Sequence, residues 1–284
     1  MEQIQIRKLG EGQIYVEYGP VAMLLMAFTN GVPRTALCYA AVETIHSSLE
    51  QIAAALPVLR CRPAEIHPGN LTGVPLEMYR AVVRTGEATL TPMAAVAGSV
   101  ADVVADFLQA EGATVAVANN GGDIALRLAP GEQLRLRTVT ALRTGETTTP
   151  VVIHSEDGIG GICTSGLGGR SFTRGVMDSL SVFSSRASWA DALATHLANC
   201  SFLESDRVAT TLAKNLAPGT DIPELTVVTA VDSLTPGERR RAVAQVLQEA
   251  ERQRKRGDLL GISGYIQGFH FAFDNTAKHW KLSD

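Results

Sequence analysis

The chain has 284 residues, 45% of them hydrophobic and 19% charged, so it can bury a large core without disulfides or a structural metal. A formal net charge of -4 gives no general attraction to phosphate backbones or anionic membranes, so we expect neither nucleic acid nor a membrane as a partner. The four cysteines include no C-x-x-C pair, which argues against a disulfide framework and a thiolate zinc site. No apolar signal segment opens the chain, which favours the cytoplasm.

The first part of the chain carries strand signals and then helical ones. Ile4 to Phe28 predicts two or three strands, since Gln13 to Tyr18 alternates in polarity. Thr35 to Leu56 has apolar residues at helical spacing, and we expect Pro57 to follow the end of that helix. A second, shorter helix is predicted around Leu76 to Val83.

A longer helix follows, with recognisable signals at both ends. Thr91 stands at the N-cap position, Pro92 at the first helical position, and Gly112 just beyond a helical run that ends near Ala110. Within it, the small residues of Met93 to Ser99 would admit either a ligand or another backbone at close range.

Next comes a predicted hairpin, with strands at Ala113 to Ala118 and Ile124 to Leu128 and a turn at Asn119 to Asp123. Asn and Gly tolerate positive φ, which tight hairpin turns require. The two consecutive glycines let a ligand approach the backbone, and their N–H groups could receive an anion.

The remaining elements do not alternate regularly between strand and helix. This order predicts an α+β fold of mixed, largely antiparallel sheets flanked by helices, in one domain over residues 1–284. The predicted segments are strands at Gln133 to Thr138 and Val151 to His154, a glycine-rich stretch at Gly158 to Gly169, a helix from Ser188 to Asn199, a strand at Leu225 to Ala230, a charged, solvated helix at Thr235 to Arg256, and a strand at Gly264 to Phe273.

Two stretches in the second half could carry chemistry. Asp191 and Thr195 are spaced i, i+4 and therefore share one helix face, where a carboxylate and a hydroxyl could ligate Mg²⁺. The alternative is a capping box, with Ser188 as N-cap and Asp191 at the third helical position. Cys163 to Arg170 could cradle a phosphate or a planar ring, or could be a flexible surface loop, and it lacks Walker A spacing.

The order of these motifs is more informative than any one of them. P-M-A-A-V-A-G from Pro92, N-G-G-D-I from Asn120, T-S-G from Thr164 and A-D-A-L-A-T from Ala190 follow one another along the chain. This succession resembles the ApbE superfamily of FAD:protein FMN transferases, and is most similar to its cytoplasmic branch. The similarity spans roughly Tyr39 to Asn199.

The resemblance implies a small-molecule nucleotide ligand, FAD or FMN, bound with a divalent cation, usually Mg²⁺. The implied metal ligands are Asp191, Thr195 and the main-chain carbonyl of Ala94. The implied flavin-nucleotide site is lined by Asn120, Gly121, Gly122, Asp123, Thr164, Ser165 and Gly166. These assignments favour the metal interpretation of Asp191 over the capping box.

The chain also departs from the transferase pattern. Ala97 occupies the position of a lysine that helps to bind FAD in the transferases, and Gly175 to Asp178 replaces their S-H-I-I-D-P segment, retaining at most the carboxylate. Transfer of FMN to a protein is therefore one of several functions to consider. A second is sulfur assimilation, the role associated with the similar branch, with Cys163 carrying sulfur unless its thiol is buried and inert. A third is a non-catalytic interaction protein that forms a homo-oligomer.

Overall fold

An antiparallel sheet of ten strands runs through the described part of the chain, which covers residues 4–137, 139–141, 146–147 and 150–274 of a computed structural model. Neighbouring strands follow the order β1-β2-β3-β5-β6-β11-β12-β15-β16, and β4 pairs with β3. The strands are β1 (Gln5–Gly10), β2 (Gln13–Tyr18), β3 (Val21–Thr29), β4 (Val32–Pro33), β5 (Val115–Asn120), β6 (Asp123–Leu128), β11 (Gly161–Ser165), β12 (Ser179–Ser184), β15 (Gly261–Ile266) and β16 (Phe269–Asp274).

Three two-stranded sheets and the helices complete the fold. The small sheets are β7 (Gln133–Leu136) with β10 (Val151–His154), β8 (Val139–Ala141) with β9 (Glu146–Thr147), and β13 (Val208–Leu212) with β14 (Thr226–Val231). The helices are α1 (Thr35–Ala40), α2 (Val42–Leu59), α3 (Gly73–Thr85), α4 (Val96–Ala110), α5 (Ala187–Asn199), α6 (Ala213–Leu216) and α7 (Pro236–Lys255). The predicted α+β class is confirmed. Thr138 and both ends of the predicted 1–284 domain lie outside the described residues.

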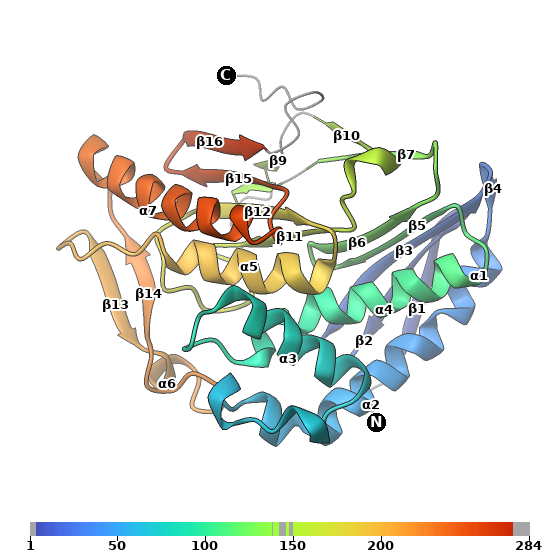
Figure 1. The fold of residues 1–284 in the computed structure, drawn as a ribbon, viewed down its shortest axis with the longest axis horizontal. Coiled ribbons are helices and arrows are strands. Elements are labelled where there is room, and N and C mark those ends of the chain that lie inside the picture. Colours follow the sequence, from blue (N-terminus) through green and yellow to red (C-terminus); the bar gives the residue numbers. More distant parts are fainter. Residues whose placement is uncertain (1–3, 138, 142–145, 148–149, 275–284) are drawn as a thin grey trace.

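Helices α4 and α5 lie across one face of the large sheet, with α2 and α3 outside them (Figure 1). Burial alternates along β3, which explains this arrangement. Val21, Met23 and Leu25 point to the helix side and are buried, while the residues between them are partly exposed. Both helices join the same hydrophobic core as β3. The segment Pro92–Ala110 is long and apolar enough to cross a membrane by length and composition only, and half of it is buried, as is typical of a core helix.

Two helix predictions need correction. The predicted helix Thr35 to Leu56 is divided at Ala41 into α1 and α2, and α2 continues through Pro57 to Leu59. Pro57 removes only its own N–H, and the following turn still closes because Arg60 N–H donates to the Leu56 carbonyl. The second correction concerns the helix predicted to start after Thr91. There, Pro92–Ala95 forms a 3-10 turn before α4, and the Thr91 side chain does not cap it.

The predicted hairpin is confirmed, with β5 and β6 joined by the two-residue turn Gly121-Gly122. Both glycines have positive φ, 66° and 113°. Two other strand regions were mispredicted. Gly161–Ser165 of the glycine-rich stretch is a strand between β6 and β12, and Gly264 to Phe273 is the β15–β16 hairpin rather than one strand.

Candidate functional site

The hairpin turn after β5 meets helix α5 at a cavity with two lobes. The larger lobe has a volume of about 490 Å³ and the smaller about 290 Å³. Thr164, Ser165, Gly166, Asn120 and Gly121 line the larger lobe. Seven residues line both lobes and form their common wall: Val96, Ala97, Asp123, Arg170, Ser171, Asp191 and Thr195.

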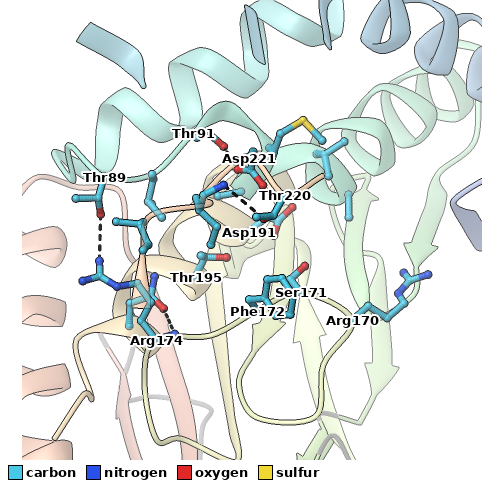
Figure 2. A pocket seen from close by; sticks show the side chains of 18 of the residues that line it. Thr89, Thr91, Arg170, Ser171, Phe172, Arg174, Asp191, Thr195, Thr220 and Asp221 are labelled. Atoms are coloured by element: carbon cyan, nitrogen blue, oxygen red, sulfur yellow. Dashed lines mark hydrogen bonds between the residues drawn. The ribbon is translucent and has the colours of Figure 1, made fainter. Parts of the chain in front are cut away.

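Asp191 and Thr195 lie one turn apart on α5 and both contribute to this common wall (Figure 2). The Asp191 carboxylate accepts a hydrogen bond of 2.9 Å from the backbone N–H of Gly98 on α4. A Cβ on Gly98 would lie 2.3 Å from the Ala187 carbonyl oxygen, so only glycine lets the two helices approach so closely. Ala94 lines the smaller lobe beside Asp191 and Thr195. The structure therefore brings the three predicted metal-ligating residues into the lining of the smaller lobe.

The capping-box interpretation of Asp191 is wrong. Helix α5 has Arg186 at its N-cap, without a side-chain capping bond, and the buried Ser188 hydroxyl has no hydrogen-bond partner among the described residues. The Asp191 carboxylate points across to α4 instead of back to its own helix start. This carboxylate is therefore positioned for the cavity.

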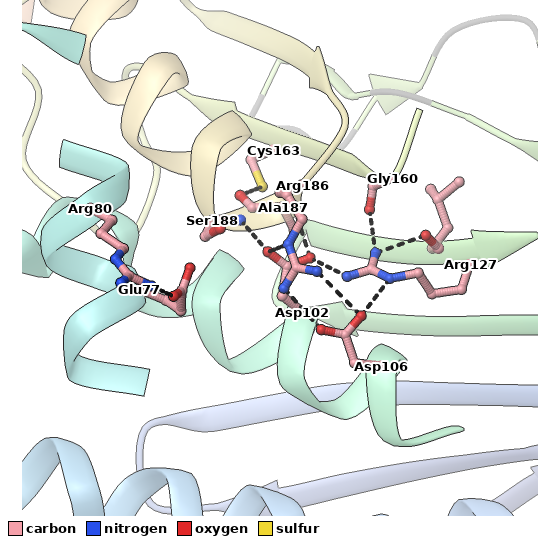
Figure 3. Close-up of polar contacts among 11 residues, drawn as sticks. Glu77, Arg80, Asp102, Asp106, Arg127, Gly160, Cys163, Arg186, Ala187 and Ser188 are labelled. Atoms are coloured by element: carbon pink, nitrogen blue, oxygen red, sulfur yellow. Dashed lines mark hydrogen bonds and ion pairs between the residues drawn. The ribbon is translucent and has the colours of Figure 1, made fainter. Parts of the chain in front are cut away.

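Asp102 of α4 supplies the missing cap. Its carboxylate accepts from the first two N–H groups of α5, those of Ala187 at 3.1 Å and Ser188 at 2.8 Å. Anionic groups at a helix N-terminus satisfy otherwise unpaired N–H donors and interact favourably with the helix dipole. Figure 3 shows this carboxylate between the start of α5 and two arginines, Arg127 and Arg186.

The two arginines complete a partly buried ion-pair network with Asp106. Arg127 donates to Asp102 at 2.8 Å and to Asp106 at 2.7 Å, and it also donates to the Gly160 carbonyl. Arg186 pairs with Asp106 at 2.9 Å. These contacts join α4, β6 and the start of α5, so the network fixes the helix that carries Asp191.

Two carboxylates share the cavity wall, and each is affected by burial. Desolvation raises the pKa of Asp123 to about 6, although its carboxylate accepts from the Thr164 N–H at 3.3 Å. Desolvation and the neighbouring Asp123 raise the pKa of Asp191 well above its usual range. Two neighbouring, half-buried carboxylates without a compensating cation are unfavourable in their charged forms. Bringing a cation to this wall would remove that cost.

The hairpin turn does not offer its N–H groups to an anion, so that part of the prediction is wrong. Gly121 N–H donates to the Ala22 carbonyl at 3.0 Å, and Gly122 N–H donates to the Asn119 side chain at 2.9 Å. Asn120 orients the turn by donating from its side-chain amide to the Ala97 carbonyl at 3.3 Å. The turn therefore shapes the wall and positions Asp123.

Asp178 is not part of the cavity lining. Its carboxylate accepts from the backbone N–H of Gln267, a residue with a φ of 46° in the β15–β16 turn. The carboxylate that Gly175 to Asp178 retains thus stabilises a distant turn. By contrast, the end of β11 does reach the larger lobe, where Thr164 and Ser165 line it. The Thr164 hydroxyl is 2.7 Å from the Ser181 hydroxyl.

Cys163 has the properties of a buried structural thiol. It is fully buried, and its S–H donates to the Ala187 carbonyl at 3.2 Å. Burial, followed by the nearby Asp123, Asp191 and Asp102, raises its thiol pKa well above the usual range. Because the thiolate is the nucleophilic form, this environment argues against a sulfur-carrying role for Cys163.

Thiol labelling of the native protein at pH 8 checks this conclusion. Burial also raises the pKa of Cys38 to about 11 and of Cys200 to about 12, which leaves Cys61 as the one cysteine expected to react quickly. We expect one fast thiol per chain, lost in Cys61→Ser. Fast labelling of Cys163, located by peptide mass spectrometry, would restore the sulfur hypothesis.

Sequence reasoning missed several cavity residues that come from distant segments. Arg170 and Arg174 bring positive charge, and the Arg174 guanidinium donates to the Thr89 hydroxyl at 3.2 Å (Figure 2). Thr91 donates its hydroxyl to Asp221 at the rim of the smaller lobe. No local motif marks Arg174 or Asp221 as cavity residues, whereas Arg170 ends the Cys163 to Arg170 stretch that the sequence offers as a possible phosphate cradle.

Comparisons with known proteins support the fold and the family. "UPF0280 protein" of Methanosarcina acetivorans is 34% identical over 125 residues, covering 43% of this chain and 48% of the relative. The protein of the same name from Methanothermobacter thermautotrophicus is 38% identical over 118 residues, covering 40% of this chain and 43% of the relative. The matches thus span about half the length of these curated relatives.

A solved structure, "Flavin Transferase ApbE from Vibrio cholerae", superimposes with a TM-score of 0.55 over 97% of this chain and 98% of that one, at 10% identity. This likeness shows the fold. The family model described as "AbpE bacteria" matches residues 6–271, nearly the whole chain. The chain therefore belongs to this bacterial family of the ApbE-like superfamily.

Proposed function

We propose that the chain binds a flavin dinucleotide, FAD, together with Mg²⁺ in the two-lobed cavity. The observation that carries the proposal is the common wall, where Asp191 and Thr195 from one face of α5 meet Asp123 from the hairpin. A dinucleotide has two bulky ends joined by a pyrophosphate, and a cavity with two lobes and a shared, oxygen-rich wall suits that shape. The combined lobes are of the size that small-molecule sites usually have.

The donor set at the wall fits a hard divalent cation. Asp191 offers a carboxylate, Thr195 a hydroxyl and Ala94 a main-chain carbonyl, and Mg²⁺ prefers a few oxygen ligands completed by water and phosphate. Within the described residues, no group of three or more His, Cys, Asp or Glu side chains is arranged to hold a metal, so soft-metal ligand sets have no support there. The two adjacent half-buried carboxylates also favour a cation, because it would compensate their charge.

The chain's own residues would orient the bound metal and nucleotide. When bound, Mg²⁺ held by Asp191, Thr195 and Ala94 would supply positive charge that stabilises a phosphate leaving group. Gly98 N–H holds the Asp191 carboxylate in place, and Thr164 N–H does the same for Asp123. Asp102 fixes the start of α5, so Asp191 and Thr195 remain one turn apart on the cavity wall.

The proposed reaction transfers the FMN half of FAD to a protein hydroxyl: the hydroxyl oxygen bonds to the FMN phosphorus and loses its proton, the pyrophosphate P–O bond breaks, and AMP leaves. The name of the Vibrio cholerae protein, a flavin transferase, supports a reaction of this class. Ala97 contributes no charge to the wall, where the transferases have a lysine. We therefore propose that nucleotide binding is the primary property of this chain and that transfer to a protein hydroxyl is slow.

Thermal denaturation tests the binding proposal. A ligand that binds only the folded state at 100 times its Kd stabilises it by about 2.7 kcal/mol, an effect of several degrees in Tm. We expect FAD with Mg²⁺ to raise Tm by several degrees, and FAD with EDTA to raise it much less. Equal shifts in Mg²⁺ and EDTA would argue against a metal-bridged nucleotide, and no shift with FAD or FMN would overturn the proposal.

A further inference from the structure

Arg170 lies where the two lobes of the cavity meet. It belongs to the loop that follows β11, and it lines both the larger and the smaller lobe. Ala97, on the common wall, is too short to bring charge to this region. In Figure 2 the Arg170 side chain extends beyond Ser171 and Phe172, with no dashed line to any residue drawn.

Arg170 is exposed, and it makes no hydrogen bond or ion pair with any residue that the structure describes, although its positive charge acts on nearby Asp123. Arg174, the other cavity arginine, differs because it donates to Thr89 and is half-buried. An arginine carries five N–H donors in a planar fork that matches phosphate oxygens. Arg170 thus has its full donor set available to a ligand.

The hairpin turn leaves room for this side chain. A Cβ built on Gly121 would lie 1.8 Å from the Arg170 Nη2 atom, so any larger residue at this position would displace the guanidinium. Glycine at position 121 thus suits the φ of 66° and also leaves space for Arg170 over the turn. The turn carries Asp123 next in sequence, which brings positive and negative charge to adjacent parts of the cavity.

We propose that Arg170 is the phosphate-binding residue of this cavity, placed on the common wall with the carboxylates and supplying the positive charge that Ala97 does not. The ligand class is a molecule with a phosphate or pyrophosphate group. The inference rests on the proposed nucleotide function and deepens it. It assigns the anion to a side chain, since the Gly121 and Gly122 N–H groups already have partners within the protein.

Calorimetric titrations in Mg²⁺ test the proposal with FAD, inorganic pyrophosphate and riboflavin, which has no phosphate. The variants are Arg170→Ala, Arg170→Lys and, as a matched control, Arg241→Ala, which removes an exposed arginine on α7. Because Arg170 is exposed and makes no hydrogen bond or ion pair among the described residues, Arg170→Ala should unfold close to the wild-type temperature. We expect Arg170→Ala to weaken the binding of FAD and of pyrophosphate about 10- to 100-fold. Arg170→Lys should recover part of that affinity, and Arg241→Ala should not change it.

The outcomes separate this inference from the proposed function. If Arg170→Ala binds FAD and pyrophosphate as tightly as the wild type, the role of Arg170 is overturned and the flavin site stands. The same conclusion follows if Arg170→Ala loses as much affinity for riboflavin as for FAD. Arg170-dependent binding of pyrophosphate without any binding of FAD supports the role of Arg170 and overturns the flavin proposal. Failure of the wild type to bind either compound overturns both.

Discussion

Replacing Asp102 by alanine is expected to destabilise the fold by about 3–5 kcal/mol, the usual cost of removing one partner from a buried ion pair. The Asp102 side chain is 2% exposed, and it meets Arg127, which is 10% exposed. Its loss would leave the first N–H groups of α5 without an acceptor and Arg127 with only part of its compensating charge. Urea denaturation, followed by circular dichroism, measures the change.

Asp106→Ala is the matched control for this prediction. Asp106 binds the same two arginines, but its side chain is 41% exposed, so water can replace much of what it supplies. We expect a loss of about 1 kcal/mol or less. If Asp102→Ala cost no more than Asp106→Ala, the network would not be what holds α5 in place.

Replacing Asp191 by asparagine is expected to abolish the Mg²⁺-dependent response to FAD while leaving the metal-free fold at least as stable as the wild type at pH 8. Asparagine keeps an oxygen that can accept from Gly98 N–H, but it removes the charge that would bind the cation. Because mutation of residues that merely support metal ligands costs 10–100-fold in affinity, loss of a direct ligand should cost about 100-fold or more.

The sign of the stability change follows from the raised pKa of Asp191. A carboxyl whose folded pKa lies above its unfolded value binds more protons in the folded state, so stability falls as pH rises from the unfolded pKa to the folded one. At pH 8 the wild type carries this cost and Asp191→Asn does not. Thermal denaturation without metal at pH 8 measures this difference in stability. A much lower Tm in Asp191→Asn than in the wild type would mean that the Asp191 carboxylate stabilises the fold.

Local signals predicted those parts of the fold whose stabilising contacts are close in sequence. The Asn-Gly-Gly turn is confirmed because positive φ is a property of the residues themselves. The predicted start of the helix at Thr235 agrees with α7, where Thr235 and Glu238, three residues apart, form a capping box. The i, i+4 spacing of Asp191 and Thr195 likewise brought both residues to one cavity.

Contacts between distant segments were beyond the reach of the sequence patterns. Ser188 and Asp191 have the spacing of a capping box, yet Asp102, from a different helix, occupies that role. The local pattern could not reveal that α4 and α5 touch at Gly98. The sequence marks Arg170 as the end of a possible phosphate cradle, Cys163 to Arg170, but not as a residue between two lobes, because that place depends on how the loop after β11 folds over the hairpin turn.

The central claim is that one cavity binds FAD through a divalent cation at the Asp191 wall. Calorimetric titration of FAD into the wild-type protein, once with Mg²⁺ and once with EDTA, tests it most directly. We predict one FAD per chain in Mg²⁺ and affinity at least about tenfold weaker in EDTA, as expected when a bridging cation is removed. Binding of equal strength in both conditions, or no binding in Mg²⁺, would contradict the claim.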